Sequence, residues 1–334
     1  AGAGQATARR AAANADIPLT VPATAINKVC LSGVNAIYLA HRMVQAGDAD
    51  IVVAGGMESM TQAPYLLPGA RAGFRAGDQT VVDSLVHDGH FCALEHQLMG
   101  EATDRYAASA SLSRSSQDEV AAASHERAAR ATKNGILAEE IVPVSVPQRR
   151  GEPVVVSTDE GIRSATTPES LAALRPAFND SGNITAGNAS QISDGASAVL
   201  VMRADTAAAR GIEPLGEIVG YGQVAGPDPS LLHQPSNAIR AALTGTDVAV
   251  DDLSLYEINE AFAAVAVASI EDLGVDPADV NVNGGAIALG HPIGASGNRL
   301  ALTLLYELRR RGGGLGAASL CGGGGQGDAL IVRV

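Results

Sequence analysis

Two stretches of the chain repeat the same order of apolar and polar positions. Residues 32–47 and 296–311 carry apolar side chains three and four positions apart, which predicts an amphipathic helix in each. Each helix opens on a Ser-Gly pair and is followed by a short apolar strand, 50–54 or 315–320, that runs into glycines. This repetition predicts one internal duplication of an α/β unit, with the two matching helices packed back to back.

Further periodic segments lie between and after these two. A capping box at Ser116 and Glu119 predicts an alanine-rich helix that ends at Asn134-Gly135. Other expected elements are β-rich pieces at 141–146 and 154–157, a helix-to-strand run at 195–202, strands at 218–220, 253–258 and 280–283, and helices at 238–243 and 260–273. From 59 to 183 the periodicity is weaker, and we interpret this part as an excursion that packs on the main body as a lid-like subdomain.

Composition and charge exclude several classes of function. The 334 residues are 46% hydrophobic and 18% charged, which is typical of an ordered protein of about two domains. The formal net charge of −13 leaves no domain-wide basic surface, so we expect no nucleic-acid binding and no adhesion to an anionic membrane. No apolar run is long enough to predict a membrane span. Three cysteines without a secretory pattern indicate a reducing compartment, so we expect a cytoplasmic protein.

Cys30 and His291 are the first candidates for chemistry. Cys30 lies at the start of helix 32–47, where free N–H groups and the helix dipole are expected to lower the thiol pKa. His291 lies at the start of the matching helix. If the helices pack about a pseudo-two-fold axis, the two residues meet as a nucleophile and its base. The alternatives are a buried structural cysteine and a satisfied structural histidine.

Cys321 ends a strand and is followed by four glycines. One glycine suffices for a turn, so this run indicates backbone N–H groups that bind an oxyanion. The alternative is a flexible surface loop. Potential metal ligands also cluster in the excursion, but their spacing fits no zinc pattern and we expect no metal site; they are His87, His90, Cys92 and His96.

Eight motifs, in order along the chain, resemble the thiolase family of acetyl-CoA acetyltransferases and 3-ketoacyl-CoA thiolases. They are NKVCLSG, VVAGGMESM, APYLLP, RPAF, TAGNAS, NEAFA, NVNGGAIALGHPIGASG and LCGGGGQG. The resemblance implies an α/β fold of two duplicated halves in a layered α-β-α-β-α arrangement with an inserted loop domain. It assigns 1–61 and 184–214 to the N-terminal half, with the first strands and helix of that half missing. It assigns 62–183 to the loop domain and 215–334 to the C-terminal half.

The resemblance also implies a reversible ping-pong acyl transfer between acyl-CoA and CoA, without a cofactor. Cys30 would form the acyl-enzyme, and His291 would activate it. His291 and a water held by Asn259 would stabilise the thioester enolate, while Cys321 would move a proton on and off the α-carbon. The backbone N–H groups of Cys30 and Gly323 would form a second oxyanion hole. An enolate needs preorganised donors and an acid–base group at carbon, which these residue types supply.

Six further residues are placed along the coenzyme A site by the resemblance. Arg163 would meet the nucleotide end, and the pantetheine channel would be lined by Met99, Phe178, Ala186, Ser190 and Phe262. From the sequence alone, Phe178, Ala186 and Phe262 are equally well explained as core. The chain departs from the family at Leu98, where a histidine is usual, and at 231–235, where a Met-Gly-x-Gly-Pro stretch is usual. Acyl specificity therefore stays open.

Two alternatives remain at this point. A decarboxylating ketoacyl-synthase-type enzyme shares the cysteine and the Gly-His-x-x-Gly-Ala pattern, but is expected to use a second histidine in place of Cys321. A non-catalytic CoA-binding or scaffold subunit is disfavoured by the intact set of catalytic residue types. The resemblance further implies a homotetramer, a dimer of dimers with tetramer contacts made by the excursion, and a place in fatty acid metabolism.

Overall fold

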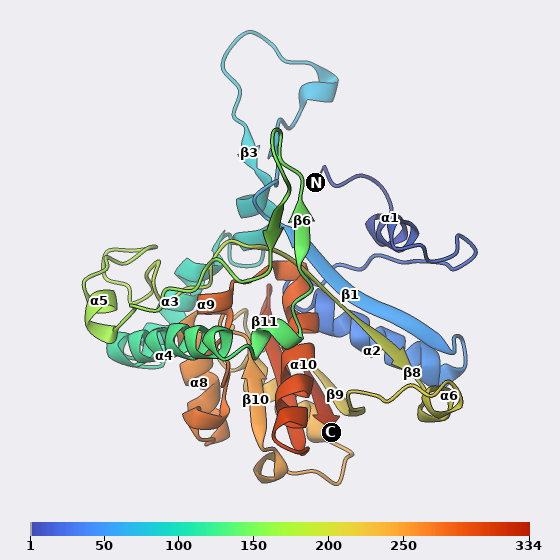
Figure 1. The fold of residues 1–334 in the computed structure, drawn as a ribbon. Coiled ribbons are helices and arrows are strands. Elements are labelled where there is room, and N and C mark those ends of the chain that lie inside the picture. Colours follow the sequence, from blue (N-terminus) through green and yellow to red (C-terminus); the bar gives the residue numbers. More distant parts are fainter. Residues whose placement is uncertain (1) are drawn as a thin grey trace.

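The duplicated helices form the centre of the molecule. In the computed structural model, which describes residues 2–334, α2 (Ser32–Ala46) and α10 (Ile293–Arg310) pack side by side (Figure 1). A Cβ on Gly33 would lie only 2.6 Å from the backbone nitrogen of Asn298, so glycine is what allows the two helices to approach. The predicted back-to-back packing of the matching helices is confirmed.

Two sheets lie on either side of this helix pair. The smaller pairs β1 (Ile51–Ser59) with β8 (Asp194–Met202) antiparallel. The larger has the strand order β10, β11, β12, β9, with bounds Leu255–Ile258, Leu315–Gly322, Gln326–Arg333 and Glu217–Ala225. In it β10 and β11 run parallel and the other neighbours antiparallel. α7 (Gln234–Leu243) packs on the far face with α8 (Ala263–Leu273) beside it, so helices and sheets alternate in layers.

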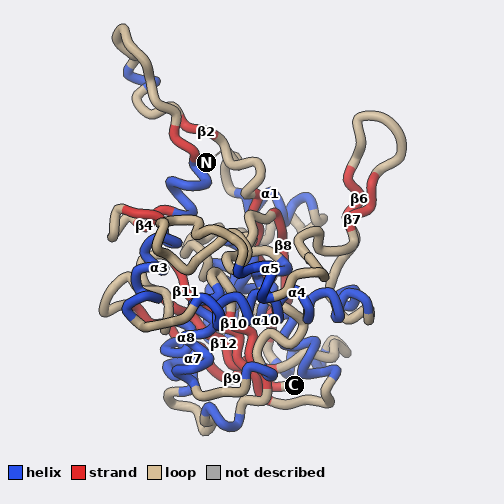
Figure 2. The backbone as a smooth tube through the Cα atoms, turned by 90° about the vertical axis from the view of Figure 1, so that its left-hand side faces the viewer, coloured by secondary structure: helices blue, strands red, loops and turns tan. Residues whose placement is uncertain are grey.

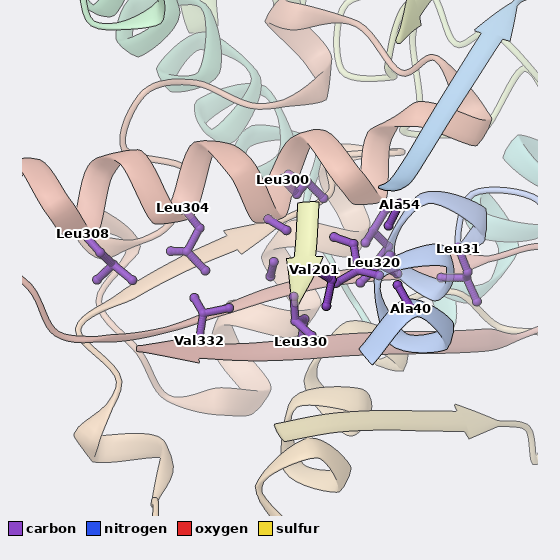
Figure 3. Close-up of a cluster of buried hydrophobic side chains, with 14 of the residues drawn as sticks. Leu31, Ala40, Ala54, Val201, Leu300, Leu304, Leu308, Leu320, Leu330 and Val332 are labelled. Atoms are coloured by element: carbon purple, nitrogen blue, oxygen red, sulfur yellow. The ribbon is translucent and has the colours of Figure 1, made fainter. Parts of the chain in front are cut away.

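The main core fills the space between α10 and the two sheets. Leu300, Leu304 and Leu308 recur every four residues along α10 and point toward Leu320 and Leu330 of the larger sheet (Figure 3). All five are at most 2% exposed. Burying one such leucine contributes about 1.5–3 kcal/mol, so this row fixes α10 on the larger sheet within the C-terminal half.

Most of the remaining elements lie between β1 and β8 in the sequence, and apart from α3 (Met99–Ser109) and α4 (Arg114–Lys133) they are short. They include two hairpins, β2–β3 and β6–β7, that project from the body (Figure 2). In the residues that the structure describes, no helix has the length and apolar character needed to cross a membrane. The bounds of the other elements are α1 Thr7–Asn14, β2 Tyr65–Leu66, η1 Ala70–Ala72, β3 Val82–Asp83, η2 Leu85–His90, β4 Phe91–Cys92, β5 Gln97–Leu98, η3 Leu137–Glu139, β6 Val144–Val146, β7 Val154–Val156, α5 Pro168–Ala172, α6 Ala204–Ala209, η4 Val250–Asp252, η5 Pro277–Asp279 and α9 Ala286–Leu289.

Strand β1 departs from its predicted length. It does not end at Gly55-Gly56 but continues to Ser59, paired throughout with β8. A Cβ on Gly56 would lie 2.0 Å from the carbonyl oxygen of Gly294, at the start of α10. The glycines are therefore required by a close approach between the two halves and not by a turn.

Three other sequence predictions are corrected. The cap of α4 is Ser113, whose hydroxyl accepts the N–H of Ser116 at 3.0 Å, so the helix begins before the predicted capping box. The expected strand at 280–283 is reduced to one bridge between Val280 and Tyr256, because Asn281 adopts a left-handed φ of 49°. The run 195–202 is strand throughout, and β12 was not predicted.

Candidate active site

A cavity of about 200 Å³ brings together residues from both halves and from the segment between β1 and β8. Its walls contain eight of the eleven candidate residues: Cys30, Met99, Phe178, Ser190, Phe262, His291, Cys321 and Gly323. Cys30 comes from the N-terminal half, whereas His291 and Cys321 come from the C-terminal half. The predicted meeting of Cys30 and His291 in one site is what the packed helices produce.

Cys30 lies in a tight turn immediately before α2 and is 4% exposed. Burial raises the pKa of its thiol to about 12, against the smaller opposing effect of hydrogen bonds from the backbone N–H groups of Cys30 and Gly323. The expected lowering of this pKa is therefore wrong. The start of the helix supplies N–H donors as predicted. Removing the thiolate from water, however, destabilises it by more than these hydrogen bonds stabilise it. Cys30 rests as a neutral thiol and needs a base.

His291 is buried and neutral. Burial, followed by the charges of Arg299 and His90, lowers the pKa of its imidazole to about 3. Its Nε2 lies 3.4 Å from Asn259 Nδ2, and its Nδ1 lies 2.6 Å from the hydroxyl of Ser296. A neutral imidazole can accept a proton, so His291 has the protonation state that a base for Cys30 requires.

Cys321 ends β11 and faces the same cavity. Burial, followed by the charge of Cys30, raises the pKa of the Cys321 thiol well above its ordinary value. The pairing of Cys321 with Gly327 in β12 then turns the chain back so that the N–H of Gly323 points at the Cys30 sulfur. Two neutral thiols and one neutral imidazole thus share the site.

The loop that carries His291 is anchored on the opposite half of the molecule. Glu58, near the end of β1, accepts the N–H of Gly294 at 3.0 Å. His291 N–H donates to the carbonyl of Gln191 at 3.3 Å. The position of the imidazole therefore depends on β1 and on the 190s segment as well as on α10.

Comparisons with known proteins identify the family. The family models for the "Thiolase, N-terminal domain" and the "Thiolase, C-terminal domain" match residues 1–205 and 212–334. The chain belongs to the thiolase family. It is a thiolase-class acyltransferase, and its predicted family and thiolase-like fold are confirmed.

Named relatives of this thiolase cover the whole chain. A "Probable acetyl-CoA acetyltransferase" of Mycolicibacterium smegmatis is 56% identical over 333 residues, which is 100% of this chain and 86% of that protein. An "Acetyl-CoA acetyltransferase" of Cupriavidus necator is 49% identical and covers 100% of this chain and 85% of its own length. A crystal structure of the Bacillus anthracis acetyl-CoA acetyltransferase is similar with a TM-score of 0.94 at 42% identity, covering 98% of this chain and 82% of that one.

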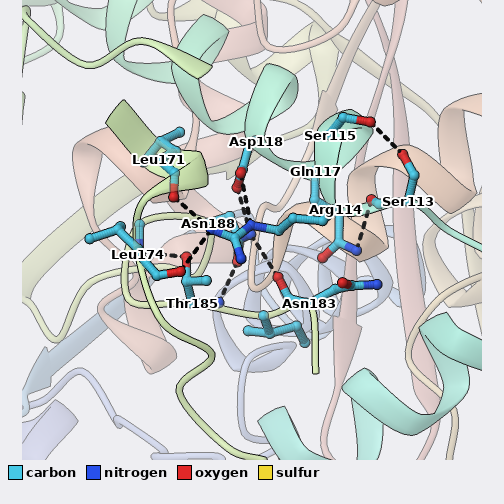
Figure 4. Close-up of polar contacts among 12 residues, drawn as sticks. Ser113, Arg114, Ser115, Gln117, Asp118, Leu171, Leu174, Asn183, Thr185 and Asn188 are labelled. Carbon is cyan, nitrogen blue, oxygen red and sulfur yellow. Dashed lines mark hydrogen bonds and ion pairs between the residues drawn. The ribbon is translucent and has the colours of Figure 1, made fainter. Parts of the chain in front are cut away.

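A buried polar network places the Thr-Ala-Gly-Asn-Ala-Ser segment of this thiolase (Figure 4). Arg114 donates to Asp118 at 2.7 Å, and the other carboxylate oxygen accepts from Asn188 at 2.9 Å. The carbonyl of Asn188 in turn accepts the N–H of Ala263, the first residue of α8, at 2.8 Å. Because Ser190 follows two residues later, α4 and α8 together set where it enters the cavity wall.

Three candidate residues lie outside the cavity wall. Asn259 contacts His291 at Nε2 through its side-chain nitrogen, and the Asn259 Oδ1 is buried with no hydrogen-bond partner among the described residues. Arg163 is exposed, and its backbone N–H donates to the buried His125 at 3.1 Å. Ala186 is exposed too, and Ala189 supplies the wall instead.

Several wall residues were not predicted from the sequence. Leu98 and Leu231 line the cavity at the two places where the chain departs from the family pattern, so those departures were a usable signal. His90 lines it as well, where the resemblance implied a position near the substrate channel but no role in the site. Among the described residues, no group of three His, Cys, Asp or Glu side chains is placed to hold a metal ion. The other unpredicted wall residues are Met60, Val86, Gly100, Ala189, Gln191, Ile192, Ala261, Ile293 and Gly322.

Proposed function

We propose that this thiolase catalyses the reversible, CoA-dependent cleavage of a 3-ketoacyl-CoA to acetyl-CoA and a shortened acyl-CoA. The reverse reaction condenses two acetyl-CoA molecules to acetoacetyl-CoA. One observation carries the proposal: two buried thiols and a neutral imidazole share one cavity, with N–H groups of Cys30 and Gly323 directed at the Cys30 sulfur. Relatives named acetyl-CoA acetyltransferase support the same substrate class.

In the first half-reaction, the proton of Cys30 moves to His291 and the thiolate attacks the keto carbon of the substrate. The N–H groups of Cys30 and Gly323 receive the negative oxygen that forms there. The carbon–carbon bond then breaks, leaving an acyl group on Cys30 and the enolate of acetyl-CoA. Cys321 gives its proton to the enolate carbon, which releases acetyl-CoA.

In the second half-reaction, the Cys321 thiolate takes the thiol proton of CoA. The resulting CoA thiolate attacks the acyl group on Cys30, and the leaving Cys30 sulfur recovers its proton from His291. All three residues return to their starting states. The unpartnered Oδ1 of Asn259 beside His291 suits a residue that holds a water at the enolate oxygen.

The acyl end of the substrate would meet an apolar wall. Leu98, Leu231 and Met60 line the cavity, whose volume of about 200 Å³ suits a short acyl group better than a long chain. We extend the proposal to CoA binding along Met99, Phe178, Ser190 and Phe262, with Arg163 at the nucleotide end and no resident cofactor. A cytoplasmic homotetramer that serves fatty acid metabolism remains part of the proposal.

The decisive experiment compares Cys30→Ala with Cys92→Ala, which removes a buried thiol outside the cavity wall. Cys30→Ala should abolish the CoA-dependent loss of acetoacetyl-CoA enolate absorbance, whereas Cys92→Ala should retain it. Mass spectrometry of the wild type with acetyl-CoA should show an acetyl group on Cys30. Turnover by Cys30→Ala would refute the mechanism, and activity on malonyl-thioesters but not acetyl-CoA would favour the ketoacyl-synthase alternative.

A further inference from the structure

An ion pair joins the turn that carries Cys30 to the β11–β12 hairpin that carries Cys321. Lys28, two residues before Cys30, donates from Nζ to both carboxylate oxygens of Asp328 at 2.7 and 2.9 Å. The Asp328 side chain is 0% exposed and that of Lys28 is 20% exposed. Asp328 lies in β12 opposite Leu320, the residue before Cys321. The pair therefore bridges the Cys30 turn and the β11–β12 hairpin directly.

Further hydrogen bonds hold the carboxylate of Asp328 in place. Tyr221 of β9 donates its hydroxyl to Asp328 at 2.6 Å, and Asn35 of α2 donates to that hydroxyl at 3.1 Å. The ring of Tyr221 stacks on Tyr38 of α2, with centroids 4.0 Å apart. Because these contacts come from α2 and β9, Asp328 is a rigid partner for Lys28 and not a mobile surface carboxylate.

The turn that Lys28 anchors is strained. Val29, between Lys28 and Cys30, has a φ of 52°, a left-handed conformation that a β-branched side chain disfavours. Such a residue costs about 1–3 kcal/mol and persists only where its surroundings hold it. Asn27 accepts the N–H of Val29 at 2.9 Å, and Ser32 donates to its carbonyl at 2.7 Å. Both of these hydrogen bonds lie within the turn. The Lys28 side chain is the group of this turn that bonds to β12.

We propose that Lys28 and Asp328 are positioning residues that hold the Cys30 sulfur at a set separation from the N–H of Gly323 and from Cys321. The role rests on the proposed function, because it matters for catalysis only if Cys30 is the nucleophile. A bridge that only stabilised the fold could lie anywhere in the sheet. This one joins the two segments whose relative placement determines the oxyanion site at Cys30.

Four variants separate positioning from folding. Lys28→Met leaves a buried carboxylate without its cation, which alone can destabilise the protein. Lys28→Met with Asp328→Asn removes both charges and keeps the shape, so this double variant is the main test. Lys28→Arg retains a cation that can meet both oxygens. Arg240→Met breaks an exposed ion pair with Asp272 and serves as the control.

Two readouts are measured on each folded variant. In the thiolase assay, the double variant should lose about 10- to 100-fold in kcat, the scale that a misplacement near 1 Å causes, with KM for CoA little changed. Lys28→Arg and Arg240→Met should stay close to wild type. The second readout is the pH profile of Cys30 alkylation by iodoacetamide, which requires no turnover. At each pH below the thiol pKa the alkylation rate follows the thiolate fraction, so the double variant should react more slowly than the wild type, since the Gly323 N–H no longer supports the thiolate.

The alkylation profile also responds to the charged and titratable groups near Cys30. The double variant removes one charge of each sign, at Lys28 and Asp328, so the net charge near Cys30 is unchanged. The other groups around the thiol are left as in the wild type; they are Glu58, His90, His291 and Cys321. A stably folded double variant with wild-type kcat and a wild-type alkylation rate at each pH would overturn the proposal. If the wild type shows no thiolase turnover, the proposed function fails, and the change in alkylation rate still decides whether the pair positions Cys30.

Discussion

Ser296 determines which nitrogen of His291 carries the proton. The Ser296 hydroxyl donates to the carbonyl of Pro292 at 3.0 Å, so it can only accept from His291 Nδ1, which lies 2.6 Å away. The proton of the neutral imidazole is therefore on Nδ1, and Nε2 keeps the lone pair that can take a proton from Cys30. A serine in the first turn of α10 thus makes the histidine before that helix a base.

Ser296→Ala should lower kcat about tenfold, because the imidazole can then adopt the wrong tautomer and rotate. KM for CoA should change little, since Ser296 does not line the cavity. Steady-state kinetics on acetoacetyl-CoA measure both constants. Ser269→Ala is the matched control, because that serine is also buried but donates to Leu232, away from the imidazole. Equal kinetics for the two variants would contradict a role for Ser296 in setting the tautomer.

Cys321→Ala should preserve acetyl transfer to Cys30 and impair cleavage of the carbon–carbon bond. Transfer of an acetyl group from acetyl-CoA to Cys30 breaks no carbon–carbon bond, so mass spectrometry should still detect the acetyl adduct. Cleavage of acetoacetyl-CoA needs a proton at carbon and should fall by about 100-fold or more. A variant that cleaves acetoacetyl-CoA at the wild-type rate would show that another group delivers this proton.

Gly100→Ala should weaken CoA binding through Phe178. A Cβ at this position would lie 2.1 Å from Cζ of the Phe178 ring, which lines the cavity and must move aside. We expect KM for CoA to rise about fivefold, equivalent to a cost of about 1 kcal/mol. Adding Phe178→Leu to the same protein should recover most of the loss. If KM is unchanged, Phe178 does not contact the substrate.

Glu257→Gln should change how stability depends on pH. Burial raises the pKa of Glu257 to about 8, so the folded protein keeps this proton at pH values where the unfolded chain has lost it. Stability is therefore lost as pH rises from about 4.5 to about 8, by at most about 1.4 kcal/mol per pH unit. The glutamine variant lacks this loss. Urea denaturation across the window should show its stability rising relative to wild type.

His291 is expected to change stability with pH in the opposite direction to Glu257. Burial lowers the pKa of this imidazole to about 3, so between about 3 and 6.5 the unfolded chain binds a proton that the folded protein does not. That residue contributes a loss of stability as pH falls below about 6.5. The control for Glu257→Gln is Glu126→Gln, which makes the same substitution at an exposed position.

The sequence could predict which residues meet but not how deeply they are buried. The duplicated pattern was enough to bring Cys30 and His291 together, because two similar halves pack through similar faces. The sign of the Cys30 pKa shift was missed because it depends on excluded water, which no local motif reports. The end of β1 was predicted too early, at Gly55-Gly56, because the backbone of Gly294 that requires Gly56 is far away in the sequence. β12 was missed because the preceding glycines suggested a loop and masked the apolar run that follows.

The thiol and its base belong to different halves of the chain. Neither the segment with Cys30 nor the segment with His291 and Cys321 holds a reaction centre by itself, and the close contact between Gly56 and Gly294 sets how the two are joined. Activity therefore requires that the two halves of the chain pack together. In a chain whose halves have each folded but have not packed together, Cys30 has no base beside it. Cys30 therefore gains its neighbouring base and the Gly323 N–H only when the two halves pack against each other.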